Sequence, residues 1–369
     1  MTSLVPWQVR QAVRDFQEWP ERRKLGPLRR KIRRHGGGVP VVGFGSVLDD
    51  GRAVHGGAVK LLHLRDALPS GEEAFDVLYA VSSSPPLGAS DLFRICAERG
   101  IKMVWNQNGV GYPGWAGREF ERFNAPMRRL RGRADFVVYQ SGFCKTSAGR
   151  FLGPCDTSSE ILYNPVDTSV FYPVRNREPG SVRLLAAGTH GTRDRVSSAL
   201  EALCALRKGG IEAELTVAGR FQWPRGEEEF SGEVSRLGLE KSVRRIARFS
   251  QADAPALYRE HDILLHPKYM DPCPTVVLEA MASGLPVVGS RSGGMPEIVP
   301  PDCGVLVDAP QDWDHRHTPS GNDLAAAVAG LLPDLPAAAA AARRNAETRF
   351  DVGKWIESHA RIFRGLRDS

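Results

Sequence analysis

The residues best suited to chemistry gather between His266 and Val288, in a segment that reads as strand, loop, helix and strand. Pro274 suits the first turn of a helix, and Gly284 suits the position just after a helix end. In a doubly wound sheet, such a loop lies at the carboxyl edge of the strands, where the free N–H groups of a helix N-terminus attract an anion. The segment therefore predicts a diphosphate site at Cys273, Pro274 and Thr275.

Two acidic residues flank this predicted helix start. Thr275 and Glu279 are four residues apart, so they project from one helix face. A carboxylate at Glu279 can accept hydrogen bonds from two vicinal ribose hydroxyls, and Asp271 in the preceding loop can accept from sugar hydroxyls. The spacing alone leaves a second interpretation open, in which Glu279 is a surface helix residue and Asp271 belongs to a turn.

Apolar runs alternate with helical patterns along the chain, which is typical of parallel βαβ units and an α/β fold. We predict an N-terminal domain over residues 1–173, a C-terminal domain over 174–349, and a C-terminal helix over 350–369 that packs back toward the first domain. Two doubly wound domains are expected to face each other across a cleft. The predicted strands are 39–44, 77–81, 103–105, 136–139, 183–187, 214–218, 243–248, 263–266 and 286–288.

Composition limits the class of protein. Hydrophobic residues make up 42% and charged residues 25% of the 369 positions, which suits two globular cores. The six cysteines are scattered and predict neither a zinc site nor a disulfide framework. The apolar stretches are shorter than a membrane helix requires, and the N-terminus lacks the pattern of a secretion signal, so we expect a cytoplasmic protein.

The net charge of +6 has one local source, residues 1–35, with ten Lys or Arg against three acidic residues. The remainder of the chain is close to neutral. This segment predicts either a peripheral contact with an anionic membrane or a solvated helix packed on the first domain. Nucleic acid is not the expected partner.

The segment 266–288 resembles the donor-site signature of family 4 retaining glycosyltransferases, enzymes with the GT-B fold of two Rossmann-like domains. That signature has two glutamates separated by seven residues, then Ala-Met-Ala-x-Gly-x-Pro-Val-Val and Gly-Gly-x-Pro-Glu. Here Asp271 and Glu279 take the places of the glutamates, and both later motifs follow, at 280–288 and 293–297. The resemblance implies that Glu279 binds the ribose and Asp271 the sugar of a nucleoside-diphosphate sugar.

Weaker resemblances lie elsewhere in the chain. Gly56 and Gly57 resemble the glycine loop that approaches the donor phosphate, and Asn164-Pro165-Val166-Asp167 resembles the crossover into the second domain. Arg248 stands where relatives contact the base, and its guanidinium could stack there. An ordinary arginine at a strand end is the alternative.

The cations for the diphosphate depart from the family pattern. Relatives carry an arginine and, five residues later, a lysine after the first strand of the second domain, whereas here Thr189 takes the arginine position. Arg193 and Arg195 are candidates for stabilising the leaving group, Lys268 is a further nearby cation, and Gly188 belongs to the same predicted site.

The acceptor is expected on the first domain, where apolar rings and amide groups mix as they do in sugar sites: Trp105, Asn106, Gln107, Asn108, Tyr112 and Trp115. Loop packing is the alternative for these residues. Asn108, which cannot serve as a general base, stands where relatives often have a histidine. The family resemblance implies front-face attack, in which the departing phosphate takes the acceptor's proton, so no metal or other cofactor is expected.

The predicted function is therefore metal-independent, retaining transfer of a hexose from a nucleoside-diphosphate sugar to a hydroxyl of a saccharide, glycolipid or natural product. Two alternatives stay open. One is another nucleotide-sugar enzyme of the same fold, such as an epimerase, a phosphorylase or an inverting transferase. The other is a nonenzymatic nucleotide or nucleic-acid binder that uses the basic N-terminus.

Overall fold

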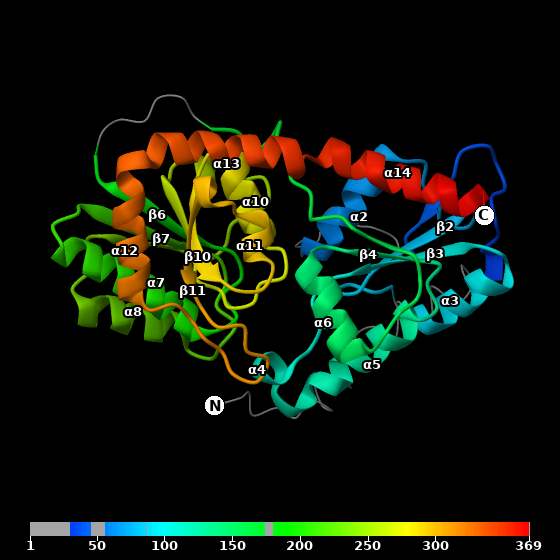
Figure 1. Cartoon of the computed structure of the whole chain (residues 1–369), viewed down its shortest axis with the longest axis horizontal. Coiled ribbons are helices and arrows are strands. Elements are labelled where there is room, and N and C mark those ends of the chain that lie inside the picture. The colour runs from blue at the N-terminus through cyan, green and yellow to red at the C-terminus, as the bar shows by residue number, and fades with distance from the viewer. Residues whose placement is uncertain (1–29, 46–55, 87, 174–179, 369) are drawn as a thin grey trace. The chain divides into compact units, whose positions relative to one another are not determined.

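The computed structural model describes residues 30–45, 56–86, 88–173 and 180–368 (Figure 1). They form two compact units, unit 1 with residues 1–163 and 353–369 and unit 2 with residues 164–352. Most of the basic N-terminal segment, residues 1–29, and the residues directly after the predicted domain boundary, 174–179, lie outside the described residues. Membrane contact through residues 1–35 stays a prediction.

The division between the units falls earlier than the predicted boundary after residue 173. Val166 donates its backbone N–H to Phe350 at 2.8 Å and accepts from Val352 at 3.0 Å, so the crossover residues pair with the far end of unit 2. The C-terminal helix α14 (Val352–Asp368) belongs almost entirely to unit 1. Unit 1 is therefore built from two separate stretches of the chain, and unit 2 from one continuous stretch.

Unit 1 is a parallel sheet with helices on both faces. Its strands follow the order β1-β2-β3-β4-β5, and every neighbouring pair is parallel. The strands are β1 (Val42–Gly43), β2 (Val77–Val81), β3 (Lys102–Gln107), β4 (Phe136–Tyr139) and β5 (Ser159–Ile161). The helices before α14 are α2 (Gly56–Ala67), α3 (Ala89–Glu98), α4 (Pro113–Ala116), α5 (Phe120–Arg131) and α6 (Gly142–Leu152), with a 3-10 turn at Gly117–Glu119.

Alternation along the strands sends neighbouring side chains of unit 1 into different cores. Leu78 and Trp105 pack in the core that contains residues of α3, α5 and α6. Tyr79 and Val104 point to the other face, where α2 and α14 cover the sheet. Both faces are buried, as expected for parallel strands.

Unit 2 is a six-stranded parallel sheet in the order β11-β10-β9-β6-β7-β8. The strands are β6 (Val182–Ala187), β7 (Ala213–Ala218), β8 (Val243–Ile246), β9 (Ile263–His266), β10 (Val287–Arg291) and β11 (Gly304–Asp308). Leu184, Leu215 and Leu265 lie in its main core, which also receives residues from several helices.

Helices cover both faces of the unit 2 sheet. α7 (Arg193–Lys208), α8 (Gly226–Leu237) and α12 (Gly321–Leu331) lie on one side, and α10 (Thr275–Ala282), α11 (Met295–Ile298) and α13 (Leu335–Arg349) lie on the other (Figure 1). α9 (Ala254–Arg259) precedes β9, and 3-10 turns occupy Pro301–Cys303 and Leu332–Asp334. The predicted α/β class with two parallel-sheet domains is confirmed.

Residues 321–349 are long and apolar enough to match the composition of a membrane span. The 3-10 turn at Leu332–Asp334 interrupts them, and α12 and α13 run in different directions on its two sides (Figure 1). Leu324, Val328 and Ala338 pack into the main core of unit 2. These features are typical of core helices in a globular domain.

Candidate functional site

The strand order of unit 2 reverses between β6 and β9. After β6 the chain adds β7 and β8 on one side, whereas β9 pairs with the other edge of β6. The loops 188–192 and 267–274 follow these two strands and therefore leave the carboxyl edge of the sheet at adjacent positions. Doubly wound sheets bind ligands at such a switch point.

The predicted helix start is present at this point. α10 begins at Thr275, and Pro274 caps it in an extended conformation without a side-chain cap bond. Val277 and Leu278 donate their backbone N–H groups to the carbonyl of Pro274, at 3.1 and 3.4 Å. The first N–H groups of the helix have no intrahelical acceptor and can bind an anion.

Asn164 fixes the loop that precedes this helix. Its Nδ2 donates to the carbonyl of Cys273 at 2.6 Å, and its backbone N–H lies 3.4 Å from the Cys273 sulfur. Cys273 and Pro274 are both buried, while Thr275 is half-buried. The crossover residue therefore fixes the turn that aims the N-terminus of α10.

Glu279 lies one turn into α10 and is 5% exposed. Its Oε1 accepts from Gln251 Nε2 at 3.0 Å, and its Oε2 accepts from the Tyr258 hydroxyl at 2.8 Å. Burial raises the pKa of Glu279, although both hydrogen bonds oppose the shift. The carboxylate thus has one polar partner on each oxygen, and each oxygen keeps a lone pair for a further donor.

Asp271 lies in the loop before α10 and is 5% exposed. His266 Nε2 lies 3.1 Å and Lys268 Nζ 2.8 Å from the same carboxylate oxygen, Oδ2. Burial alone would raise the pKa of Asp271, but Lys268 and His266 outweigh it and hold the pKa below its ordinary value. The carboxylate is therefore ionised at neutral pH.

The two candidate arginines of the first loop differ sharply. Arg195 is buried and donates to the carbonyls of Ala187 at 2.7 Å and Thr189 at 3.2 Å, so it fastens the loop from inside. Burial lowers its pKa to about 10, which leaves the guanidinium charged at neutral pH. Arg193 is 59% exposed in its side chain and reaches Glu229 only at 3.7 Å, so it can turn toward a ligand.

A histidine that the sequence did not single out lies in the same loop. His190 is fully buried, and its Nε2 lies 3.1 Å from the carbonyl of Ala218. Its Nδ1 has no hydrogen-bond partner in the described part of the chain. Burial, followed by the charge of Arg195, lowers the pKa of His190 well below its ordinary value, so the ring is neutral.

Two glycines allow the loops to approach α10 and each other. Gly188 has a φ of +101°, and a Cβ there would lie 3.2 Å from a methyl group of Val276 in the first turn of α10. Gly293 has a φ of +64°, and a Cβ there would lie 2.6 Å from the carbonyl carbon of Met270. A larger residue would strain the backbone at either position.

The remaining predicted donor residues have separate surroundings. Lys268 is 47% exposed in its side chain and pairs with Asp271. Arg248 is exposed and makes no side-chain hydrogen bond or ion pair with the described residues. Gly56 and Gly57 begin α2 instead of forming a loop, and the preceding residues 46–55 lie outside the described ranges. Base and phosphate contacts by these residues stay predictions.

The structure buries two of the predicted acceptor residues, Trp105 and Gln107, in the core of unit 1. Both are fully buried, and the Trp105 indole donates to Gln107 Oε1 at 2.8 Å while its ring packs edge-on against Phe93. Alternation along β3 turns these two side chains into the core beneath α3 and α5. The sequence pattern had grouped them with neighbours that face the opposite way.

Asn106 and Asn108 belong to a different cluster. Lys60 Nζ, on α2, donates to Asn106 Oδ1 at 2.9 Å and to Asn108 Oδ1 at 3.0 Å. Tyr112 is buried, whereas Trp115 is 54% exposed. Of the predicted acceptor residues, Asn108 and Trp115 are the most accessible, and their contact with an acceptor stays a prediction.

Three partners of the site were missed by sequence reasoning. Gln251 and Tyr258 bind Glu279, and His266 binds Asp271. Gln251 and Tyr258 precede Glu279 by more than twenty residues, so no local spacing links them to it. His266 was visible only as the residue that ends a strand five positions before Asp271.

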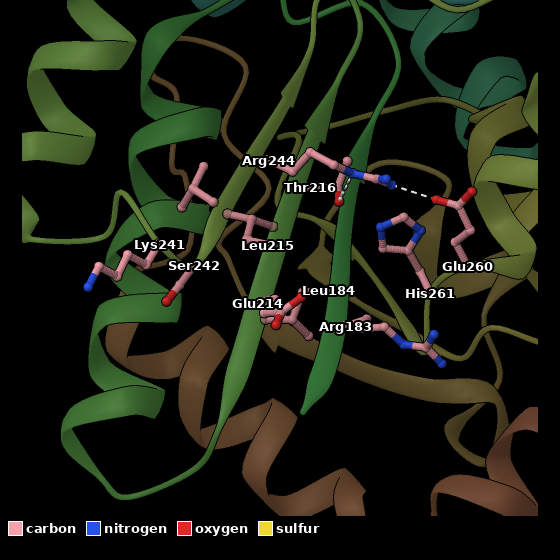
Figure 2. A pocket seen from close by; sticks show the side chains of 11 residues that line it. Arg183, Leu184, Glu214, Leu215, Thr216, Lys241, Ser242, Arg244, Glu260 and His261 are labelled. Atoms are coloured by element: carbon pink, nitrogen blue, oxygen red, sulfur yellow. Dashed lines mark hydrogen bonds and ion pairs between the residues drawn. The ribbon is translucent and has the colours of Figure 1, made fainter. Parts of the chain in front are cut away.

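A cavity of about 300 Å³ lies at the opposite edge of the unit 2 sheet, near the amino ends of β6, β7 and β8 (Figure 2). Arg244 reaches Glu260 at 2.6 Å and Thr216 at 3.2 Å, and Arg183 binds Asp262. Its arginines are thus paired with neighbouring groups, and the cavity is separate from the loops at the switch point. We assign the candidate site to those loops because the anion-binding geometry is there.

Comparisons with known proteins agree with this placement. Residues 174–317 match the family model described as glycosyl transferases group 1. A D-inositol 3-phosphate glycosyltransferase of Corynebacterium glutamicum (strain R) is 33% identical over 133 residues, which cover 35% of this chain and 27% of that protein. A glycogen synthase of Mycobacterium tuberculosis is 26% identical over 257 residues, covering 68% and 59%. The chain thus spans less than two thirds of the length of these relatives.

Solved structures share the fold of most of this chain. Anabaena Alr3699/HepE, crystallised with UDP and glucose, gives a TM-score of 0.68 at 16% identity and covers 88% of this chain and 100% of its own. Sucrose-phosphate synthase from Thermosynechococcus elongatus gives 0.64 at 18% identity, covering 84% and 76%. At these identities the likeness concerns the fold, which is GT-B. Through residues 174–317, the chain is similar to the glycosyl transferases group 1.

Proposed function

We propose that this protein is a retaining glycosyltransferase that moves a hexose from a nucleoside-diphosphate sugar to a hydroxyl acceptor without a metal ion. The observation that carries the proposal is the arrangement around α10. Its N-terminus is free to bind an anion, Glu279 lies one turn further in, and Asp271 is fixed in the loop before it. The names of the relatives, which include glycosyltransferases and a glycogen synthase, support the reaction class.

The groups around the start of α10 have separate roles in this proposal. The N–H groups at Thr275 and Val276 stabilise the charge that develops on the diphosphate as it leaves. Arg193, which is exposed and only loosely paired, adds positive charge there. Glu279 accepts hydrogen bonds from the ribose, and Asp271 accepts one from the sugar.

The reaction requires no general base from the protein in this scheme. The acceptor oxygen forms a bond to the anomeric carbon while the bond from that carbon to the diphosphate oxygen breaks on the same face. The acceptor's proton passes to the departing phosphate oxygen. The products are a nucleoside diphosphate and a glycoside of unchanged anomeric configuration, so the protein contributes position and charge stabilisation.

A binding screen tests the donor site directly. Full-length protein is heated with UDP, GDP or ADP, and we expect one of them to raise the melting temperature because it binds only the native state. UDP is the first probe, since the neighbour Alr3699/HepE was crystallised with it. Glu279→Gln should abolish the shift, whereas Glu240→Gln, which changes an exposed glutamate on the same unit, should preserve it.

Turnover tests the reaction. The binding nucleotide is then supplied as its sugar conjugate with a panel of hydroxyl acceptors, and the anomeric configuration of the product is read by NMR. Retention is expected. An inverted product would refute the front-face scheme, and a melting temperature unmoved by all three nucleotides would refute the donor site itself.

A further inference from the structure

Both hydrogen-bond donors to Asp271 contact the same oxygen. His266 Nε2 and Lys268 Nζ lie 3.1 and 2.8 Å from Oδ2. Within the described ranges, Oδ1 accepts no hydrogen bond. The carboxylate is therefore held by one oxygen, and the other keeps its full capacity as an acceptor.

The ring of His266, which binds Oδ2, is itself oriented by a contact at its other nitrogen. His266 is 1% exposed at the end of β9, and Arg195 Nη2 lies 3.4 Å from its Nδ1. Since an arginine can only donate, Nδ1 is the acceptor and Nε2 carries the proton toward Asp271. Arg195 is in turn tied to the carbonyls of Ala187 and Thr189.

The backbone of this loop is also fixed. Gly294 donates its N–H to the carbonyl of Asp271 at 2.9 Å, and Met270 donates its N–H to Ser292 Oγ at 2.9 Å. Met270 has a φ of +49°, a conformation that a non-glycine residue keeps only when its surroundings impose it. Main chain and carboxylate are thus oriented independently.

We propose that His266 is a positioning residue for sugar recognition: with Lys268 it fixes Oδ2 of Asp271, so that Oδ1 accepts a hydrogen bond from a hydroxyl of the donor sugar. The inference rests on the proposed function. His266 acts through Asp271 and does not touch the sugar.

The test separates binding of the sugar from binding of the nucleotide. Titration calorimetry compares UDP with UDP-glucose, GDP with GDP-mannose, and ADP with ADP-glucose on the full chain, and the pair that binds wild type is kept. His266→Leu should weaken binding of the nucleotide sugar about tenfold, because it removes the hydrogen bond that orients the charged Asp271. Binding of the free nucleoside diphosphate should weaken less than about twofold, since Asp271 contacts only the sugar. His266→Gln, whose Nε2 can replace that of histidine, should restore most of the loss.

A second variant covers the risk that a buried histidine is needed for folding. Lys268→Met removes the other donor from an exposed position, and we expect it to weaken the nucleotide sugar about threefold with the free nucleotide unaffected. Lys241→Met, an exposed lysine at the opposite edge of the sheet, is the matched control. Equal losses for nucleotide and nucleotide sugar, or failure of glutamine to rescue, would overturn the inference, whereas wild type that binds no nucleoside diphosphate would instead overturn the proposed function.

Discussion

Tyr258→Phe removes the hydrogen bond from the tyrosine hydroxyl to Glu279 without changing the shape of the core. Tyr258 is fully buried, its hydroxyl lies 2.8 Å from Oε2, and its ring packs edge-on against Phe171. Phenylalanine keeps that ring contact and leaves a buried carboxylate with one donor fewer. A hydrogen bond to a charged group contributes about 1.5–3 kcal/mol, so we expect the free energy of unfolding to fall by about that amount at neutral pH.

The pH dependence of this loss follows from the pKa of Glu279. Burial already raises that pKa, and the hydrogen bond from Tyr258 opposes the rise, so removing it raises the pKa further. A carboxyl group with a raised folded-state pKa destabilises the fold above that pKa and ceases to do so when it is protonated. The difference between variant and wild type should therefore shrink as the pH falls from neutral through the raised pKa, because a neutral hydrogen bond contributes only about 0.5–1.5 kcal/mol.

Urea denaturation followed by circular dichroism measures the effect. With a slope of about 2 kcal/mol per molar urea, the midpoint should fall by about 1 M at neutral pH and by less in mild acid. Tyr172→Phe, which changes an exposed tyrosine of unit 2, should leave the midpoint in place. An unchanged midpoint for Tyr258→Phe at neutral pH, or an equal loss at both pH values, would refute the assignment of an ionised, tyrosine-bound Glu279.

Three further predictions concern the loops, the charge and the metal. Gly293→Ala should lower the melting temperature by several degrees, because φ is +64° and a Cβ would meet the carbonyl carbon of Met270, while Gly232→Ala in α8, where a Cβ has open space, should not lower it. Arg193→Met should weaken nucleoside-diphosphate binding about threefold to tenfold at low salt and less at high salt, as calorimetry at two ionic strengths would reveal, and equal losses at both would contradict a charge contact. EDTA should leave the transfer rate unchanged in a donor-consumption assay, and a loss restored by Mg²⁺ or Mn²⁺ would refute the metal-independent scheme.

Local pattern was sufficient for most elements of the fold. The strands predicted at 77–81, 136–139 and 263–266 have those bounds in the structure, because each is a short apolar run buried on both faces. β5 and β11 were not predicted. β5 has only three residues, and none of them is buried. Its pairing with β4 therefore determines that it is a strand more than its own composition does.

The candidate site, too, was readable from local spacing only in part. The spacing of Thr275 and Glu279 was readable because a helix has a known period, and the structure places both on α10. The burial of Trp105 was not readable from the sequence, because a run of polar and aromatic residues gives no hint of which face of β3 each will occupy. That choice depends on the helices that cover the sheet.

The order of residue types along the chain determined where the strands and helices form, where the anion-binding helix begins and which acid follows it by one turn, since each of these depends on neighbours within a few positions. The reversal of strand order between β6 and β9 decided the rest. It placed Arg195 within hydrogen-bonding distance of His266, and His266 next to one oxygen of Asp271, while the other oxygen of Asp271 stays available as an acceptor. Contacts of this kind join segments some seventy residues apart, and only the pairing of β6 with β9 brings them within hydrogen-bonding distance.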